Sequence, residues 1–279
     1  MINAKEAFLK ASTELKENGI ENSTYEVREI FKELLKLNPF DIDFAQKELS
    51  QSQEDLLNDA VNRRKMHEPL QYILKKWEFM SLDFNVRSGV LIPRQDTETL
   101  VECALEVVKQ NNFTQCADLC TGSGCIGISL CHYSKGLFTQ GYDISDAAIE
   151  LATENAFLNS CDRFIAKKHD VLLSAIGKYD IIVSNPPYIK TQVISSLQSE
   201  VKDYEPHLAL DGGESGYEFY KAIIPLWKNA LNKGGYMCFE CGEGQAEEIV
   251  KLFEVNGFSQ IRTFKDYNKI DRVISAKLL

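Results

Sequence analysis

The chain has 279 residues, 44% of them hydrophobic, which suits one large or two ordinary domains with a sizeable core. Its 41 acidic residues outnumber its 31 basic residues, so the formal net charge is −10. This charge argues against sequence-independent binding to the phosphate backbone of nucleic acids. No apolar run reaches the roughly 18 residues that span a bilayer, and we expect no membrane association.

The N-terminus is charged and helix-periodic, which is not typical of a secretory signal, and we expect a cytoplasmic protein. The eight cysteines and four histidines are scattered along the chain. A zinc site would need histidines or a second well-spaced cysteine pair beside Cys238 and Cys241. We therefore expect reduced, buried thiols and no metal site.

Residues 1–68 are predicted to form a small helical bundle. Apolar or small residues recur on one helical face through three segments, which are residues 4–19, 23–39 and 52–69. Ser23 with Glu26, and Ser52 with Asp55, have the spacing of N-terminal capping boxes. We interpret the apolar stripes as core packing.

Residues 69–92 are predicted to form a β-hairpin that links two domains. Apolar and polar side chains alternate there, and the apolar positions are Trp77, Phe79, Leu82, Phe84 and Val86. Alternation over this length is typical of short, half-buried strands. A helix with an acidic first turn and an apolar stripe is expected next, over residues 93–110.

Beyond residue 115, strand-like and helix-like segments alternate. Seven strands are predicted, at residues 116–120, 138–143, 164–170, 179–184, 236–241, 260–264 and 272–279. Helices are predicted at residues 121–134 (after a glycine loop), 145–159, 216–235 and 244–257. Alternation of this kind implies βαβ units. We predict an α/β, doubly wound, mostly parallel, Rossmann-like domain over residues 93–279.

A glycine loop from Gly122 to Gly127 matches the pattern G-x-G-x-x-G, and Asp143 ends the next predicted strand. A dinucleotide-binding enzyme and an S-adenosylmethionine-binding enzyme both fit this pattern, because glycines bring backbone close to a ligand at a helix N-terminus while a carboxylate holds ribose hydroxyls. Asp118 precedes the loop, where it would repel a pyrophosphate but suit an α-ammonium group. This favours S-adenosylmethionine.

Two further aspartates have competing interpretations. Asp143 is placed to bind ribose, but it also precedes a helix that it could cap. Asp170 follows the third strand, where it could meet an adenine amino group or serve as a helix cap.

The stretch Asn185-Pro186-Pro187-Tyr188 ends the buried strand at 179–184. In doubly wound sheets, ligands bind beyond the carboxyl ends of the strands. A planar NH2 group is a poor nucleophile and needs its hydrogens held. The Asn185 side-chain oxygen can accept one hydrogen and the Pro186 carbonyl the other, while Tyr188 offers a flat wall. Asn-Pro alone is also a common turn.

"SNPPYI" with "DLCTGSGCIGISL" resembles the amino-methyltransferases, and four other stretches are similar to the release factor glutamine N5-methyltransferases. These stretches are "EPLQYILKKWEFMSLDFNV", "VLIPRQDTETLVE", "EPHLALDGGESGYEFYKAII" and "KDYNKIDRVISAKL". The resemblance covers nearly the whole chain. It implies a seven-stranded methyltransferase sheet and methyl transfer from S-adenosylmethionine, with S-adenosylhomocysteine as product. The acceptor it implies is the glutamine of the Gly-Gly-Gln motif in release factors.

The resemblance also implies roles for individual residues. Asn185, Pro186, Pro187 and Tyr188 would hold the glutamine. The residues that we expect to hold the cofactor are Asp118, Cys120, Thr121, Gly122, Ser123, Gly124, Asp143, Asp170, Val171 and Asn185. We expect residues 1–68 to bind the protein substrate. We expect the protein to have no direct nucleic acid partner.

Three departures from the family pattern stand in this chain. Cys120 replaces the usual glycine, so we expect a slightly displaced loop that still binds. The family's "PRPETE" is "PRQDTE" here, which we expect to alter the loop over the site. Val171 is smaller than the side chain that often flanks adenine.

The alternative function is methylation of exocyclic amines on DNA or RNA bases, because the same turn would hold a nucleobase amine. Such an enzyme flips its base and holds flanking phosphates with Lys and Arg. The net charge of −10 and the short basic clusters disfavour it. A non-catalytic module that binds S-adenosylmethionine is disfavoured because Asn185 is intact.

Overall fold

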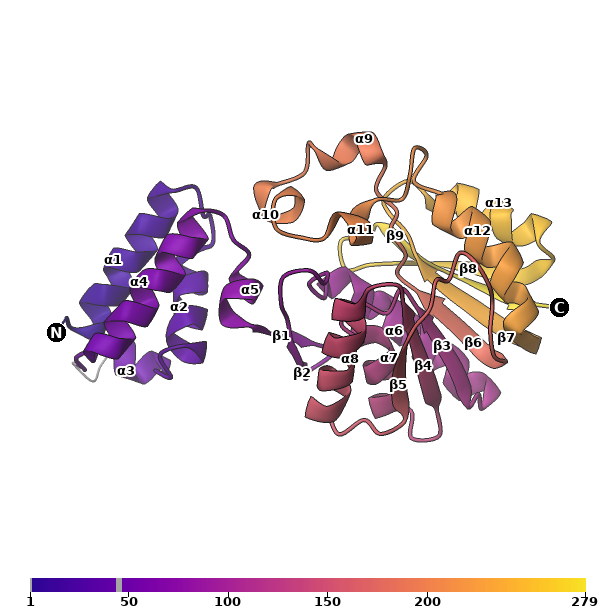
Figure 1. The fold of residues 1–279 in the computed structure, drawn as a ribbon, viewed down its shortest axis with the longest axis horizontal. Helices are drawn as coiled ribbons and strands as arrows, with labels where there is room; N and C mark the ends of the chain where they lie inside the picture. The colour runs from indigo at the N-terminus through magenta and orange to yellow at the C-terminus, as the bar shows by residue number, and fades with distance from the viewer. Residues whose placement is uncertain (1, 44–46) are drawn as a thin grey trace. The chain divides into compact units, whose positions relative to one another are not determined.

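A computed structural model describes residues 2–43 and 47–279 of the chain (Figure 1). The chain divides into two compact units. One unit holds the residues up to Lys76 together with Gln198–Tyr204, and the other holds Trp77–Leu197 and Glu205–Leu279. The finer boundaries at 68/69 and 92/93 stay predictions.

The first unit is helical, as predicted for the N-terminal part of the chain. Its helices are α1 (Ala4–Glu17), α2 (Ser23–Glu33), α3 (Pro39–Asp43), α4 (Gln51–Lys65), α5 (Leu70–Leu74) and α10 (Ser199–Lys202). The predicted apolar face of α1 is buried, for example at Phe8 and Leu15. It packs with the apolar faces of α2 and α4 in one hydrophobic cluster. Leu70–Leu74 is helical, so the segment predicted as a hairpin becomes strand only from Lys76.

Both predicted capping boxes are wrong. Helix α2 has Asn22 at its cap position, with no side-chain cap hydrogen bond. The box of α4 is formed by Ser50 and Gln53, because Ser50 is the extended residue at which the chain enters the helix. Ser50 Oγ accepts from Gln53 N (3.3 Å), and Gln53 Oε1 accepts from Ser50 N (3.0 Å).

Arg64, in the last turn of α4, is buried with a relative exposure of 3%. Its guanidinium donates to Glu26 Oε2 (2.5 Å) and to Glu200 Oε1 (2.6 Å). Glu26 therefore serves an ion pair rather than the cap predicted for it. Burying a guanidinium is costly unless carboxylates compensate it, so the three side chains depend on one another.

The second unit begins with a hairpin of β1 (Lys76–Phe79) and β2 (Leu82–Asn85). Met80 and Ser81 connect the strands with φ of +50° and +56°. Two successive positive φ values give the tight turn that suits the twist of a hairpin. The predicted hairpin is therefore present, although shorter than its predicted segment.

The main sheet has seven strands in the order β5-β4-β3-β6-β7-β9-β8, and β9 runs in the direction opposite to the other six. The predicted doubly wound, mostly parallel sheet is confirmed (Figure 1). The strands are β3 (Gln115–Leu119), β4 (Phe138–Asp143), β5 (Phe164–Lys168), β6 (Tyr179–Ser184), β7 (Leu231–Glu240), β8 (Phe258–Lys265) and β9 (Asp271–Leu278).

Helices cover both faces of this sheet. Alternate residues of β6 face opposite ways, since Ile181 and Val183 pack in one cluster while Ile182 packs in another. The first cluster includes residues of α6 and α7, and the second includes residues of α12 and α13. The helices of this unit are α6 (Glu98–Asn111), α7 (Cys125–Tyr133), α8 (Asp146–Leu158), α9 (Thr191–Ile194), α11 (His207–Leu210), α12 (Glu218–Trp227) and α13 (Ala246–Val255), with the 3₁₀ helices η1 (Gln95–Thr97) and η2 (Lys228–Ala230).

The helix predicted over 216–235 is too long. Helix α12 ends at Trp227, and β7 already begins at Leu231, which pairs with Tyr179 of β6. Pairing with a central strand therefore overrides the local helical pattern. None of the helices in residues 2–43 and 47–279 has the length and apolar character needed to cross a bilayer.

Replacing Arg64 by Met should lower the free energy of unfolding by about 2–3 kcal/mol, because Glu26 would stay largely buried without its partner. Urea unfolding followed by circular dichroism measures this change. The control is Lys10→Met, which removes an exposed cation 4.0 Å from Glu14 and should cost no more than about 0.5 kcal/mol. Equal unfolding midpoints for the two variants would contradict the interpretation of Arg64.

Candidate active site

A cavity opens at the carboxyl ends of the parallel strands. Its wall includes the loop after β3, the end of β4, the residues after β5 and the turn after β6. Strand β3 lies between β4 and β6, so the chain leaves β3 toward one side of the sheet and later returns on the other. Ligands of doubly wound sheets bind at such a switch point.

The glycine loop after β3 has the backbone expected of a ligand-binding turn. Gly122 and Gly124 have φ of +54° and +80°, and a Cβ at Gly124 would lie 2.9 Å from Ile128 Cδ1. Cys120 also has a positive φ, +59°, which strains a non-glycine residue by about 1 kcal/mol or more. The loop thus holds a conformation that suits glycine at position 120, although a cysteine stands there.

Asp118 lies beneath the loop, completely buried. Its Oδ2 accepts from Thr121 Oγ1 (2.6 Å) and Gly127 N (3.1 Å), while Oδ1 has no partner among the described residues. Burial raises its pKa to about 7. Asp118 stabilises the loop through these two hydrogen bonds, and its second carboxylate oxygen is buried without a partner among the described residues.

Asp143, at the end of β4, lines the cavity next to the loop. Its Oδ2 accepts from Gly122 N (2.9 Å) and its Oδ1 from Ser145 N (3.0 Å). Ser145, not Asp143, caps α8, so the competing interpretation of Asp143 as the cap is wrong. Each carboxylate oxygen can accept a further hydrogen bond, which fits a pair of ligand hydroxyls. Burial raises its pKa.

Asp170 and Val171 line the far end of the cavity, after β5. Asp170 Oδ1 accepts from Leu172 N (2.9 Å), which forms a local turn rather than a helix cap. Val171 is buried, and its carbonyl accepts from Trp227 Nε1 (2.8 Å). This end therefore combines an apolar side chain with a carboxylate, which suits a flat base with an amino group.

The proline turn follows β6 directly. Asn185 and Pro187 line the cavity. Tyr188 is not among the described lining residues. Its hydroxyl donates to Glu240 Oε1 (3.3 Å), and its carbonyl accepts from Gln245 Nε2 (3.0 Å). A Cβ on Gly212 would lie 2.6 Å from Tyr188 Cα, so a second backbone segment packs directly against the turn.

Most residues predicted for the cofactor also line this cavity. The predicted residues in its wall are Cys120, Thr121, Gly122, Ser123, Asp143, Asp170, Val171, Asn185 and Pro187. The other four are not part of the described wall: Gly124, Pro186 and Tyr188 adjoin lining residues in the chain, and Asp118 lies two residues before Cys120.

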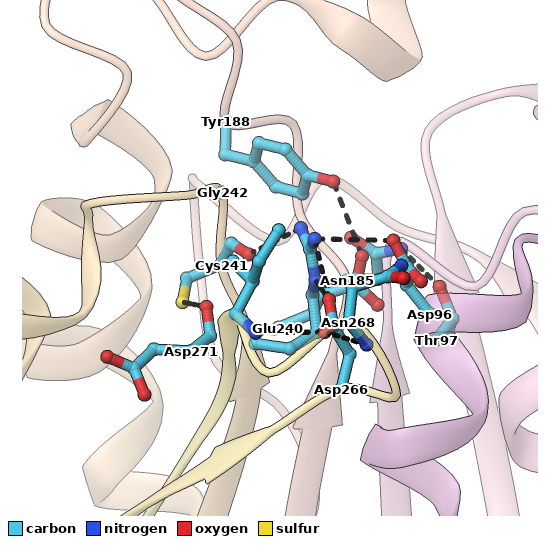
Figure 2. A network of polar contacts seen from close by, with 12 residues as sticks. Asp96, Thr97, Asn185, Tyr188, Glu240, Cys241, Gly242, Asp266, Asn268 and Asp271 are labelled. Carbon is cyan, nitrogen blue, oxygen red and sulfur yellow. Dashed lines mark hydrogen bonds and ion pairs between the residues drawn. The ribbon is translucent and has the colours of Figure 1, made fainter.

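A polar network behind Asn185 was missed by sequence reasoning (Figure 2). Asn185 Nδ2 donates to Thr97 Oγ1 (3.2 Å). Asp96, next to Thr97, pairs with Arg272 of β9 (3.2 Å), which also donates to Asp266 Oδ2 (2.9 Å). The two stretches "PRQDTE" and "KDYNKIDRV", far apart in the chain, thus meet here. Their similarity to family signatures was the only signal that could have pointed to this network.

Two further observations concern cysteines and metals. All eight cysteines are free, and all except the half-buried Cys120 are buried, as predicted. Within the described residues, no three His, Cys, Asp or Glu side chains gather in a way that could hold a metal ion.

The strand order, the glycine loop and the site at the switch point define a methyltransferase. The fold is shared with the catalytic domain of hMettl16 solved with the MAT2A 3′UTR hairpin 6, with a TM-score of 0.57, 16% identity and coverage of 82% of this chain and 83% of that one. It is also shared with a methyltransferase from Pyrococcus furiosus, with a TM-score of 0.53, 16% identity and coverage of 77% and 98%.

Sequence comparison identifies the family. Residues 6–74 match the PrmC N-terminal domain, and residues 95–214 match the methyltransferase small domain. The release factor glutamine methyltransferase of Clostridium acetobutylicum is 41% identical over 98% of this chain and 97% of its own length. That of Fusobacterium nucleatum is 39% identical over 97% of this chain and 77% of its own. The chain belongs to the release factor glutamine methyltransferase family.

Replacing Asp143 by Asn should weaken binding of S-adenosylhomocysteine at least tenfold, because an amide NH2 would face the N–H of Gly122 or Ser145 and could no longer accept a second hydroxyl. Titration calorimetry measures the dissociation constant. The matched control is Asp146→Asn, which removes an exposed carboxylate three residues further on and should leave affinity unchanged. If Asp143→Asn and the wild type bound S-adenosylhomocysteine with equal affinity, Asp143 would not be a ligand-binding residue.

Proposed function

We propose that this protein transfers a methyl group from S-adenosylmethionine to the side-chain amide nitrogen of the glutamine in the Gly-Gly-Gln motif of release factors. Identity of 41% to a release factor glutamine methyltransferase over 98% of the chain supports this substrate. The observation that carries the chemistry is Asn185, placed at the cavity after β6 with its Nδ2 already bonded to Thr97. Its oxygen is then left to accept a hydrogen from a substrate.

The lining residues fit S-adenosylmethionine from end to end. Asp143 would hold the ribose hydroxyls, and Asp170 with Val171 would hold the adenine. The backbone of residues 120–124 would hold the methionine moiety, with Asp118 acting on its ammonium group from below. When bound, the ligand supplies a methyl group made electrophilic by the neighbouring positively charged sulfur.

The work of the protein is to orient a weak nucleophile. The lone pair of an amide nitrogen is delocalised, so it attacks only when the NH2 group is held and aimed. Asn185 Oδ1 and the Pro186 carbonyl would each accept one hydrogen of the glutamine amide. Pro187 has no N–H that could compete for the Pro186 carbonyl. Both hydrogen bonds strengthen as the nitrogen gains positive charge, so they stabilise the transition state more than the bound substrate. One of these protons leaves after transfer.

The helical segment 1–68 would dock the release factor, and residues 69–92 would link it to the catalytic domain at 93–279. The match of residues 6–74 to the PrmC N-terminal domain supports a role particular to this family. Family membership also favours the amide substrate over exocyclic amines of DNA or RNA bases. The −10 net charge, which disfavours a phosphate-binding surface, points the same way.

Mass spectrometry tests the proposed reaction. The enzyme is incubated with S-adenosylmethionine and a release factor, with a Gly-Gly-Ala release factor variant and DNA as separate samples. We expect one added methyl group, located on the glutamine of the motif, and none on the variant or on DNA. Methyl groups found only on DNA would reverse the assignment.

Asn185→Ala should lower kcat by about two orders of magnitude, because one of the two oriented acceptors is lost. Its dissociation constant for S-adenosylhomocysteine should stay within about threefold of wild type, since the remaining cavity wall is intact. Single-turnover kinetics and calorimetry measure the two quantities. A variant that turns over at the wild-type rate would show that Asn185 does not hold the substrate.

A further inference from the structure

A buried carboxylate lies behind the proline turn and has no role in the reaction described above. Glu240 ends β7 and is 1% exposed. Its Oε1 accepts from the Tyr188 hydroxyl (3.3 Å), while Oε2 is buried without a hydrogen-bond partner among the described residues. An unpaired buried carboxylate oxygen is costly, so its retention calls for an explanation.

Thr97 connects this carboxylate with Asn185. The Thr97 hydroxyl accepts from Asn185 Nδ2 (3.2 Å), so its single proton remains to be donated. Glu240 is the nearby acceptor, because its Oε2 lacks a hydrogen-bond partner among the described residues and the Thr97 side chain offsets part of the rise in its pKa. Figure 2 shows Thr97, Asn185, Tyr188 and Glu240 gathered at this point.

A hydrogen bond from the Thr97 hydroxyl to Glu240 would fix the direction of the bond between Thr97 and Asn185. An ionised carboxylate can only accept, so it draws the Thr97 proton toward itself. The Thr97 oxygen is then left as an acceptor, which matches the NH2 end of the Asn185 amide and not its oxygen end. Without the carboxylate, the Thr97 hydroxyl could turn and donate, and Asn185 could present NH2 to the substrate instead of oxygen.

We propose that Glu240 is a positioning residue for methyl transfer: through the Thr97 hydroxyl it fixes the Asn185 amide with Nδ2 turned away from the substrate and Oδ1 turned toward it. The proposal deepens the proposed function and rests on it. Glu240 touches no reacting atom, and its effect passes through two side chains.

The rest of the network holds Thr97 in place for this task. Asp96 pairs with Arg272, and Arg272 Nη1 donates to the Cys241 carbonyl (3.2 Å), next to Glu240 in the chain. The segment that carries Thr97 is thereby tied to the strand ends that carry Glu240. If Thr97 were displaced, its hydroxyl could no longer orient the Asn185 amide.

Burial raises the pKa of Glu240 to about 7, so its ionised form is lost as the pH falls through neutrality. The titratable groups that face it are Asp96, Cys125, Tyr188, Tyr220, Cys241 and Arg272. Burial raises the pKa of both cysteines to about 12 and raises the pKa of both tyrosines. A protonated Glu240 can donate to Thr97 and would release the Asn185 amide.

The first experiment is a double-mutant cycle on kcat for release factor methylation. Glu240→Gln and Thr97→Val each keep the side-chain shape, and each should lower kcat at least tenfold with unchanged affinity for S-adenosylhomocysteine. The kcat of the double variant should be no lower than that of the slower single variant, because both substitutions interrupt the same chain of hydrogen bonds. Thr97→Ser keeps the hydroxyl and should stay within about threefold of wild type.

Glu243→Gln is the matched control, since it removes an exposed carboxylate three residues beyond Glu240 and should leave kcat unchanged. Wild-type kcat in folded Glu240→Gln, or additive losses in the double variant, would overturn the proposal. If Glu240→Gln does not fold, Thr97→Val decides, and wild-type kcat in that variant overturns it.

A second measurement does not depend on the substrate, so it separates failure of this proposal from failure of the proposed function. The side-chain NH2 signals of Asn185 are observed by NMR in ¹⁵N-labelled enzyme and assigned by their loss in Asn185→Asp. We expect these signals to shift with pH near neutrality in wild type and not in Glu240→Gln. Identical pH responses in the two proteins would overturn the proposal even if the release factor proved not to be the substrate.

Discussion

The hydrogen bond from Asn185 Nδ2 to Thr97 Oγ1 (3.2 Å) is the contact on which the arrangement of the site depends. A side-chain amide has two ends of nearly the same shape, and only a fixed partner distinguishes its donor from its acceptor. The fold supplies that partner from η1, which is held in turn by Arg272 of β9. The antiparallel strand at the end of the chain thus supports a turn that follows a parallel strand near its middle.

Carboxylates around the cavity give the site its electrostatic character. Asp118 lies under the glycine loop, Asp143 lines the wall and Glu240 lies behind the turn, and burial raises the pKa of each. A cavity bordered by carboxylates that lack solvation favours a ligand with positive charge. A methyl donor with a sulfonium and an ammonium group meets this condition, whereas a pyrophosphate does not.

Residues outside the glycine loop act on the backbone of the proline turn. Gly212 approaches Tyr188 so closely that a Cβ there would lie 2.6 Å from its Cα, and a Cβ on Gly242 would lie 3.1 Å from its ring. Gln245 donates to the Tyr188 carbonyl. Packing against two other loops keeps the proline turn in one conformation, which a catalyst that works by positioning requires.

The amino-acid sequence by itself determined the features that depend on local chemistry. Alternating strand-like and helix-like segments identified the seven strands and the main helices, the G-x-G-x-x-G pattern identified the loop after β3, and two prolines marked the turn at Asn185. The tertiary structure alone decided the rest. Helix α12 ends where β7 pairs with β6, and Thr97, Glu240 and Arg272 meet only because the strand order places β9 next to β7. Contacts between segments far apart in the chain leave no periodic trace in it, so no local pattern could reveal them.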